Sequence, residues 1–473
     1  MTSLLWIVLD SVRIDHLSCY GYEWNTTPNL EEFRRDAVRF EQAFAPGPWT
    51  PPSHGSMFTG RYPSHHGHFA DEMEMSGTPI AAVLADTGYT TFSVNTSAKL
   101  AGHSPLSAGF ETCLELFRLP FVPSTFEELD DYYLSMLVPW IHFAYRRFVF
   151  KEKVPFLVTA ALRAQMKRAT DRESPFFGFV NYLSAHSPYD PPEPFRSEFT
   201  GSSDPADPDL VESLATRGGY RVMAGEVDPA ASDWRAVKDR YDGEIAYIDR
   251  EIARLFRRLR SLDIYDETMI IVTADHGEHF GEHGLAYHQF SLFDELLHVP
   301  LLIKFPGNEY AGKTVDNLVS LVDIYPTVLD VIDVDGINDY DGRSLYPPEA
   351  SGHDAVFAEY LPKASTLEAL ETYAEREVPS DVLDRFDRGL QCVRTSSHKY
   401  VRVTNGRDRL YDLGNDRYER HDLLEEGDGS PGTVAEDLSE RIDSTLSELP
   451  KATPTQASYD AAVMENLREL GYI

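Results

Sequence analysis

Three separate stretches of the sequence place polar side chains just after an apolar run. Asp10 follows one such run, Asp275 and His276 follow another, and His186 comes shortly after a third. A single Asp at such a point often only forms the next turn, but three such points are hard to attribute to chance. The carboxyl ends of parallel strands meet at the edge of an open α/β sheet, where ligands bind. Two carboxylates and an imidazole gathered there would suit a divalent cation.

A fourth stretch could hold a reactive oxygen still. Thr50 stands immediately before Pro51 and Pro52, and the stretch closes at Gly60. Proline disfavours a helical residue before it and fits a first helical turn, so a helix is expected to begin near Pro52 with its free amides facing Thr50. Such a helix end favours an anion or an oxyanion. The alternative is an ordinary proline-rich turn capped by Thr or Ser.

These polar positions need a scaffold of alternating strands and helices. Apolar, β-branched and aromatic runs predict strands at residues 4–9, 90–94, 176–183, 269–274, 299–303 and 317–322. Helical spacing of apolar positions predicts helices at residues 28–40, 52–59, 80–86 and 241–262. The alternation predicts an α/β protein, with the last of these helices covering the sheet.

The sequence changes character twice along the chain. We predict a catalytic α/β domain over residues 1–350, with an inserted helical, basic and aromatic lid at about 117–172. Charged helices and short strands beyond it predict a small C-terminal α/β subdomain over residues 351–473, ending in a helix over 434–449. We expect this subdomain to close one side of the cleft.

The predicted lid is the most basic part of the chain. Seven basic residues and one acidic residue lie between Trp140 and Thr170. Residues 130–170 could meet lipid headgroups or an anionic polymer at a membrane surface. The alternative, a helix whose aromatic side chains pack on the main domain, explains most amphipathic helices and is preferred here.

Composition excludes several classes of function. The chain has 473 residues, of which 42% are hydrophobic and 12% aromatic, so it folds around a large core in two to four domains. Its 43 basic and 77 acidic residues, 33 Arg to 10 Lys, leave a formal charge of −34. We expect such an acidic surface to bind no nucleic acid and to reflect a halophilic source; a cationic partner is the alternative.

Cysteine usage and hydropathy point to a cytoplasmic protein. The three cysteines are widely spaced and predict neither a disulfide framework nor a thiolate zinc site. No signal peptide or apolar run of membrane-spanning length is recognisable, so we expect no transmembrane segment.

Taken together, the polar stretches resemble the sulfatase family of the alkaline phosphatase superfamily over nearly the whole chain. The matching stretches are residues 7–10, 15–22, 50–61, 185–189, 274–284, 323–327, 341–345 and 410–413. The resemblance implies a large mixed, mostly parallel sheet sandwiched by helices. It also implies one metal site made by Asp10, Asp275, His276 and the oxygen of Thr50.

The resemblance further implies anion contacts from His186 and from His288, which stands where relatives often carry a lysine. True sulfatases place Cys or Ser at the position of Thr50, because these residues can be converted to formylglycine. Threonine cannot, and several phosphoryl-transferring relatives use it directly, so we expect no formylglycine. His54 replaces a common arginine and Ser11 a second aspartate that often binds calcium, which leaves Ca, Mn, Zn and Mg open as the metal.

The expected mechanism is in-line attack by the Thr50 oxygen on a tetrahedral phosphorus or sulfur, with its hydroxyl activated by the metal. His54, His186 and the helix amides are candidates to stabilise the ester oxygens, and His186 or His288 to protonate the leaving group.

Three further residues are candidates for substrate binding: Lys99, Asn95 and Arg61. For Lys99 the alternative is a surface cation on a loop.

We therefore expect a metal-dependent hydrolase or transferase of phosphate mono- or diesters. A sulfatase that uses unmodified Thr50 is one alternative, and an inactive binding protein for anionic glycans or lipids is another. The substrate would be an anionic small molecule, glycan or lipid ester, and the oligomeric state is not predicted.

Overall fold

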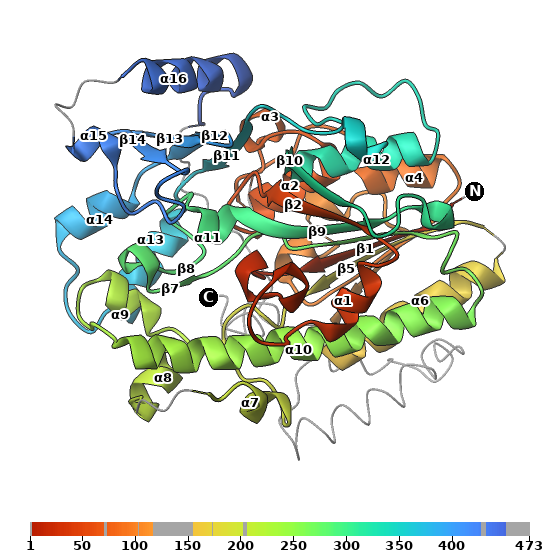
Figure 1. Cartoon of the computed structure of the whole chain (residues 1–473), viewed down its shortest axis with the longest axis horizontal. Helices are drawn as coiled ribbons and strands as arrows, with labels where there is room; N and C mark the ends of the chain where they lie inside the picture. Colours follow the sequence, from red (N-terminus) through yellow and green to blue (C-terminus); the bar gives the residue numbers. More distant parts are fainter. Residues whose placement is uncertain are drawn as a thin grey trace.

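An eight-stranded sheet forms the centre of the computed structural model (Figure 1), which describes residues 2–70, 73–102, 104–116, 155–172, 174–201, 206–426 and 432–450. The strand order is β10-β2-β9-β6-β1-β5-β3-β4. The bounds are β1 Leu4–Leu9, β2 Val38–Phe44, β3 Thr90–Asn95, β4 Thr112–Glu115, β5 Phe176–Tyr182, β6 Met269–Thr273, β9 His298–Lys304 and β10 Thr314–Ser320. Only β9 runs antiparallel to its neighbours, β2 and β6. The predicted mixed, mostly parallel sheet is confirmed.

Strand β1 is the buried middle of this sheet. It pairs in parallel with β5 on one side and with β6 on the other, and all six of its side chains are buried. A strand covered on both faces has no solvent side, which is why it reads as an unbroken apolar run. The pairing brings the carboxyl ends of β1, β5 and β6 to the same edge.

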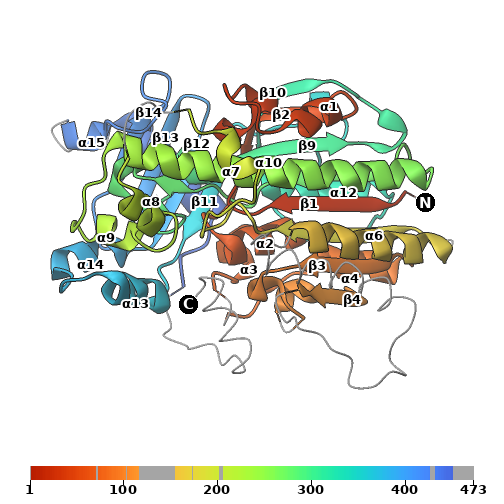
Figure 2. The same cartoon turned by 90° about the horizontal axis from the view of Figure 1, so that it is seen from below.

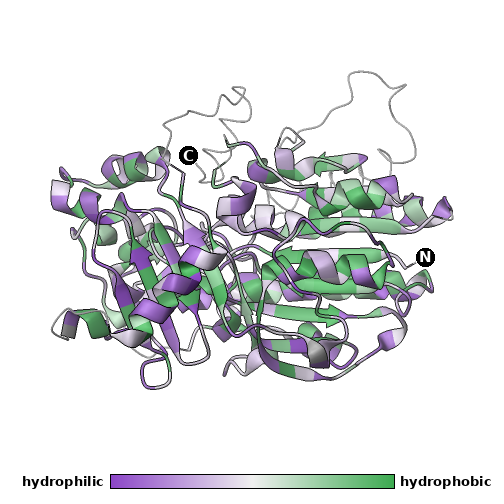
Figure 3. Ribbon diagram, turned by 90° about the horizontal axis from the view of Figure 1, so that it is seen from above, coloured by the Kyte–Doolittle hydropathy of each residue, from purple (hydrophilic) through white to green (hydrophobic). Residues whose placement is uncertain are grey.

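Helices cover both faces of the sheet (Figures 1 and 2). One face carries α1 Pro28–Phe33, α6 Pro155–Asp171 and α10 Ala231–Ser261; the other carries α2 Thr50–Thr59, α4 Ile80–Asp86 and α12 Ile324–Val331. Figure 3 shows the strands of the large sheet as mainly hydrophobic. The apolar positions of α10, such as Ile245 and Ile252, are buried against the sheet, as the helical spacing predicts.

The remaining elements lie in loops and at the C-terminal end. Short helices are α3 Pro63–His66, α7 Phe195–Glu198, α8 Pro208–Leu214, α9 Gly219–Met223, α11 Asp294–Leu297, α13 Ala364–Tyr373, α14 Ser380–Phe386, α15 Leu423–Glu426 and α16 Thr433–Thr445. A two-stranded ribbon joins β7 His279–Phe280 to β8 Ala286–Tyr287. A separate antiparallel sheet contains β11 Val356–Tyr360, β12 Leu390–Arg394, β13 His398–Val403 and β14 Arg409–Asp412.

The two sheets share buried side chains. Phe44 of β2 and Leu318 of β10 lie in one apolar cluster with Val356 and Leu390 from the second, and Trp49, just before α2, joins this cluster. An ion-pair network adds to this contact: the buried Lys399 ammonium lies 2.8 Å from Asp294 and 2.9 Å from Glu419. The division at residue 350 therefore stays a prediction, since the small sheet packs directly on the large one.

The helix predicted over residues 28–40 is wrong in its second half. Helix α1 ends at Phe33, and Val38–Phe44 forms strand β2. Pairing with β9 and β10 decides the conformation there, because local helical spacing is weaker than two flanking strands. Two helix starts also differ: α2 begins at Thr50 rather than near Pro52, and α10 at Ala231 rather than 241.

Only part of the predicted lid lies within the described residues. Helix α6 packs on β5 and β3 as a sheet-covering helix. Residues 117–154, with most of the predicted membrane-facing segment, lie outside the described ranges. None of the helices described combines the length and the apolar content that a membrane span needs.

Candidate active site

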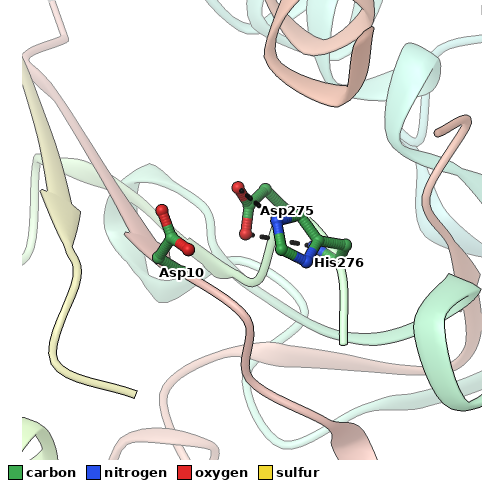
Figure 4. A group of neighbouring side chains, drawn as sticks. All are labelled: Asp10, Asp275 and His276. Carbon is green, nitrogen blue, oxygen red and sulfur yellow. Dashed lines mark hydrogen bonds and ion pairs between the residues drawn. The ribbon is translucent and has the colours of Figure 1, made fainter. Parts of the chain in front are cut away.

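The predicted carboxylates and imidazole meet at the carboxyl edge of the large sheet. Asp10 comes directly after β1, and Asp275 and His276 follow β6 (Figure 4). One ligand atom from each lies within 4.8 Å of the others, and all three residues are buried. In the part of the chain that the structure describes, this is the one such group of three metal-ligand side chains.

Neighbouring groups orient the two carboxylates. The Asn181 amide donates to Asp10 Oδ2 at 3.0 Å, and the Ser11 hydroxyl donates to Oδ1 at 3.0 Å. The backbone N–H groups of Ser11 and His276 donate to Asp275 Oδ1, at 3.2 and 3.1 Å. Each carboxylate is therefore held by fixed donors, as metal-ligating carboxylates are in other proteins.

Two atoms that could bind a cation have no hydrogen-bond partner. Asp275 Oδ2 and His276 Nε2 are buried without a hydrogen-bond partner. His276 Nδ1 lies 2.9 Å from the Gly277 carbonyl and donates to it, which leaves the lone pair on Nε2. Burial first, and then the charge of Asp10, raises the pKa of Asp275 well above its usual range. Two buried carboxylates side by side are costly alone and are stabilised by a positive ion, so the donor set fits a divalent cation.

Thr50 begins the helix that reaches this group. It is the first residue of α2, it is buried, and Trp49 before it has extended backbone angles. The Ser53 hydroxyl donates to the Asp275 carbonyl at 2.7 Å, which ties the first turn of α2 to the loop after β6. Thr50 thus stands beside the three metal-ligand side chains, but the free amides predicted for this turn are not found: Pro51 and Pro52 carry no N–H, and the Ser53 N–H donates to the Trp49 carbonyl at 3.3 Å.

His54 lies underneath the site. Its Nδ1 donates to the Thr50 carbonyl at 3.0 Å and lies 3.5 Å from Asp275 Oδ2. Its ring is fully buried, edge-on to Phe58 and Phe179. Burial lowers the pKa of His54 to about 4, so the ring is neutral at pH 7. A neutral buried imidazole cannot supply the positive charge of the arginine it replaces.

His186 and His288 lie together beside the metal-ligand group. Their ring centroids are 4.9 Å apart, and His288 is 4.4 Å from His276. The His288 Nδ1 lies 3.1 Å from Glu278, whose other oxygen accepts from Tyr189 at 2.9 Å. Burial raises the pKa of Glu278 to about 8. The two imidazoles therefore face Asp10 as a pair, and Glu278 orients one of them.

Lys99 approaches the site from the loop after β3. Its ammonium lies 4.7 Å from the centre of the Trp49 ring. Burial and the charge of His186 lower the pKa of His288, and the charge of Lys99 lowers it further. Asn95 donates from Nδ2 to the Leu100 carbonyl at 3.0 Å, so it holds this loop rather than reaching outward.

Arg61 is not brought to the site. It follows the far end of α2, about 15 Å from Thr50 along a ten-residue helix. Its guanidinium lies 3.3 Å from the exposed carboxylate of Asp339. Arg61 lies too far away to touch an ester held at Thr50.

Three residues near the site were not predicted from the sequence. Asn181 is an amide near the end of an otherwise apolar strand, and that contrast could have indicated it. Glu278 lies in residues 274–284, one of the stretches that resemble the family, but the resemblance implies no role for it. Lys363 lies with its ammonium 5.9 Å from the centre of the Trp49 ring, and no local signal marks it, because it comes from the far C-terminal part of the chain.

Comparisons with known proteins identify the family of the chain. The family model Sulfatase matches residues 2–334, and the model N-sulphoglucosamine sulphohydrolase, C-terminal, matches residues 281–448. Uncharacterized sulfatase YidJ of Escherichia coli (strain K12) is 22% identical over 90% of this chain and 83% of its own length. The Ulvan-active sulfatase of Formosa agariphila is 22% identical over 94% of this chain and 81% of its own.

Solved structures show the same fold. The phosphonate monoester hydrolase of Agrobacterium radiobacter superposes with a TM-score of 0.69 at 23% identity, over 97% of this chain and 100% of its own. The protein BT4656, solved with its substrate D-glucosamine-2-N,6-O-disulfate, superposes with a TM-score of 0.67 at 18% identity, over 94% of this chain and 97% of its own.

Proposed function

Because the chain belongs to the sulfatase family and is a hydrolase of sulfate or phosphate esters, we propose that it cleaves phosphate mono- or diesters by direct attack of the Thr50 oxygen. The observation that carries the proposal is the position of Thr50. It is the first residue of α2, which Ser53 ties to Asp275 of the metal-ligand group. No Cys or Ser stands there to be converted, so the hydroxyl itself is the nucleophile.

Asp10, Asp275 and His276 would hold one divalent cation, with the Thr50 oxygen beside it. When bound, the cation lowers the pKa of a hydroxyl that it contacts and neutralises charge on ester oxygens. The donor set of two carboxylates and one imidazole favours Mn²⁺ or Zn²⁺ over Ca²⁺, which prefers six to eight oxygens. Ser11 supports this choice, because a carboxylate at its position would add an oxygen ligand.

The protein groups divide the remaining work. The Thr50 hydroxyl gives its proton to solvent, and its oxygen then forms a bond to phosphorus while the bond to the leaving oxygen breaks on the opposite side. His186 gives its proton to that leaving oxygen and then takes one from the water that releases the phosphoryl group from Thr50. His288 is the second candidate for this role, and burial lowers its pKa well below the usual range, which makes it the weaker proton donor. Lys99 and Lys363 favour an anionic substrate. His54 acts as a positioning residue, through the Thr50 carbonyl and Asp275.

The substrate class is an anionic small molecule, glycan or lipid ester. A phosphoryl ester suits an unmodified hydroxyl nucleophile, which is why we place phosphate first. A sulfate ester is the second candidate, because two of the similar proteins are named sulfatases and the donor set contacts a sulfuryl group equally well. An inactive anion-binding protein is the third; the complete metal-ligand group argues against it.

Replacing Thr50 with Ala tests the proposal. We expect kcat/KM for the best substrate among aryl phosphate monoester, diester, phosphonate and sulfate to fall at least about 1,000-fold, because the covalent route is removed. Bound metal, measured by elemental analysis, should stay near one ion per chain, since the three protein ligands remain. Thr59→Ala is the matched control: it lies on the same helix but bonds only the Gly55 carbonyl.

Three results would contradict the proposal. Undiminished hydrolysis by Thr50→Ala would remove Thr50 from the mechanism. Turnover of the sulfate ester alone would replace the phosphate assignment with the sulfatase alternative, and no turnover with any of Mn²⁺, Zn²⁺, Mg²⁺ or Ca²⁺ would favour a binding protein.

A further inference from the structure

Four arginines line one hollow on the helical face of the large sheet. Arg163 comes from α6, and Arg254, Arg257 and Arg258 come from the last turns of α10, with Ser261 completing the wall. The hollow has a volume of about 330 Å³. That is roughly ten times the 30 Å³ that one water occupies in the liquid, so the space exceeds what a single ordered water or a small ion needs.

Few carboxylates balance these charges. Arg254 pairs with the buried Glu251, at 2.8 Å. Among the residues that the structure describes, no carboxylate lies within ion-pair distance of the guanidinium groups of Arg163, Arg257 or Arg258. Burial first, and then the charges of Arg258, Arg254 and Arg257, lowers the pKa of Arg163. The chain has a formal charge of −34, but four guanidinium groups with one carboxylate make the local charge at the hollow positive.

Two structural explanations account for only part of the cluster. Cations near the C-terminus of α10 are favoured by the helix dipole, but Arg163 stands in the middle of another helix. Arg260, also near the end of α10, shows what an arginine with a purely structural role does here: it lies over the Tyr265 ring and 3.5 Å from Asp36. Arg254 also has such partners, Glu251 at 2.8 Å and the Phe156 ring at 5.9 Å, but it shares one space with the other three lining arginines.

The hollow is separate from the active site. Tyr241, on the same helix, donates to the Ser11 carbonyl at the active-site edge of the sheet. Arg257 is sixteen residues further along α10, which is roughly 24 Å at the rise of an α-helix. A ligand bound in the hollow would therefore not touch the reacting ester.

We propose that this arginine hollow is a second anion site that binds a group carrying adjacent phosphoryl groups. Arginine presents a planar fork of donors that matches phosphoryl oxygens in pairs, and several forks around one space suit two or three phosphoryl groups better than one. Two sources have this chemistry, a soluble oligophosphate and a multiply phosphorylated lipid headgroup.

Calorimetric titration with inorganic tripolyphosphate tests the site. The wild-type protein should show a binding event that Arg163→Gln/Arg257→Gln weakens at least about tenfold, because two charge-assisted contacts are removed. Arg260→Gln is the matched control and should change the affinity less than about twofold, since a single exposed charge contributes little. Asp275→Asn removes anion binding at the active site and should leave this event in place. Hydrolysis of an aryl ester by the double variant should equal that of the wild type, which also checks its folding.

A second arm identifies the source. A pelleting assay uses phosphatidylcholine vesicles that contain a few per cent of a bisphosphorylated inositol lipid. The control vesicles contain phosphatidylserine instead, in the amount that gives the same total charge. Selective pelleting that the double variant loses supports the site with a lipid headgroup as ligand, and tripolyphosphate binding without pelleting supports it with a soluble oligophosphate. Equal tripolyphosphate affinity in the wild type and the double variant overturns the proposal, as does an equal loss in Arg260→Gln or the absence of binding to the wild type.

Discussion

Asn181 is uncharged, yet it determines how the Asp10 carboxylate is presented. Its amide donates to Asp10 Oδ2 and both side chains are fully buried, so no water can take over this bond. A carboxylate that is fixed in advance loses less entropy when it binds a cation. The amide therefore belongs to the metal site although it cannot itself be a strong ligand.

Replacing Asn181 with Leu should weaken metal binding by about 10- to 100-fold, the usual cost of losing a partner that orients a ligand. Activity at saturating metal should change much less, because all the ligands and Thr50 remain. A metal titration read by calorimetry measures the first effect and kcat the second. Asn317→Ala, which loses only a hydrogen bond to the Ser351 carbonyl, is the control. Unchanged metal affinity in Asn181→Leu would mean that Ser11 alone orients Asp10.

For single residues, the sequence indicates the metal-ligand side chains better than the residues that orient them. Asp10, Asp275 and His276 could be found because each directly follows an apolar strand, and the sheet topology then places them together. Lys363 could not be found, because its proximity to Trp49 depends on how the second sheet packs on the first. Arg61 was included for its place in the sequence motif, but a ten-residue helix separates it from Thr50.

Among the elements, the loop after β6 is closely packed against α11. Gly277 follows His276 and accepts from its ring, and its own N–H donates to the Leu296 carbonyl at 2.8 Å. A Cβ at this position would lie 2.0 Å from the Glu295 carbonyl oxygen, a backbone atom that cannot move aside alone. The start of α11 thus fixes how the loop presents Asp275 and His276.

Gly277→Ala should therefore lower the free energy of unfolding by about 1–3 kcal/mol, as overpacking typically does. Metal affinity should fall as well, because relief of the clash displaces His276. Urea unfolding and metal titration measure the two effects. Gly432→Ala, where a Cβ meets nothing within 4 Å, should change neither. A fully stable Gly277→Ala with normal metal affinity would show that the loop can move without cost.

Helix α10 carries a pH-sensitive contact with α1. The Asp249 carboxylate accepts from the backbone N–H groups of Asn29 and Leu30, at 3.0 and 2.9 Å, where α1 begins. Burial raises the pKa of Asp249 from 3.8 to about 6. The folded state therefore holds this proton more tightly than the unfolded state, and stability from this group is complete below about pH 3.8 and is lost as the pH rises through 6.

We expect the free energy of unfolding of the wild type, relative to Asp249→Asn, to rise by about 1 kcal/mol from pH 7 to pH 5. Urea unfolding of both proteins at pH 7, 6 and 5 measures the difference, and the variant removes the contribution of all other groups. A relative stability that falls with decreasing pH would have the opposite sign and would mean that the N–H donors outweigh burial.

The order of elements was largely predictable, and the boundaries less so. Strands 4–9 and 269–273 are buried on both faces and appear as apolar runs, whereas β2 lies near the sheet edge and mixes Arg39 and Glu41 with apolar residues. An amphipathic helix can have the same mixture of polar and apolar residues. Only the pairing with neighbouring strands therefore determines that this segment is a strand. The second sheet was expected from its strands and turn, but its packing on Trp49 was not.

For the whole molecule, the formal charge of −34 sets the response to salt. We expect Tm to rise by at least about 4 °C between 0.1 and 1 M NaCl, because the Debye length falls from about 10 to 3 Å and self-repulsion is screened. Thermal unfolding followed by circular dichroism measures this, with sucrose at equal osmolality as the control. A Tm that falls over this range would contradict the halophilic character predicted from composition.

The contact between Lys399 and Asp294 can form only late in the synthesis of the chain. A ribosome releases Asp10, α2 and the loop that carries Asp275 and His288 long before it releases Lys399 and Glu419. Until then the Asp294 carboxylate, at the end of that loop, has no cation from β13 to pair with. The nascent chain can assemble its catalytic strands early, but their loop gains its last electrostatic support only as synthesis nears completion.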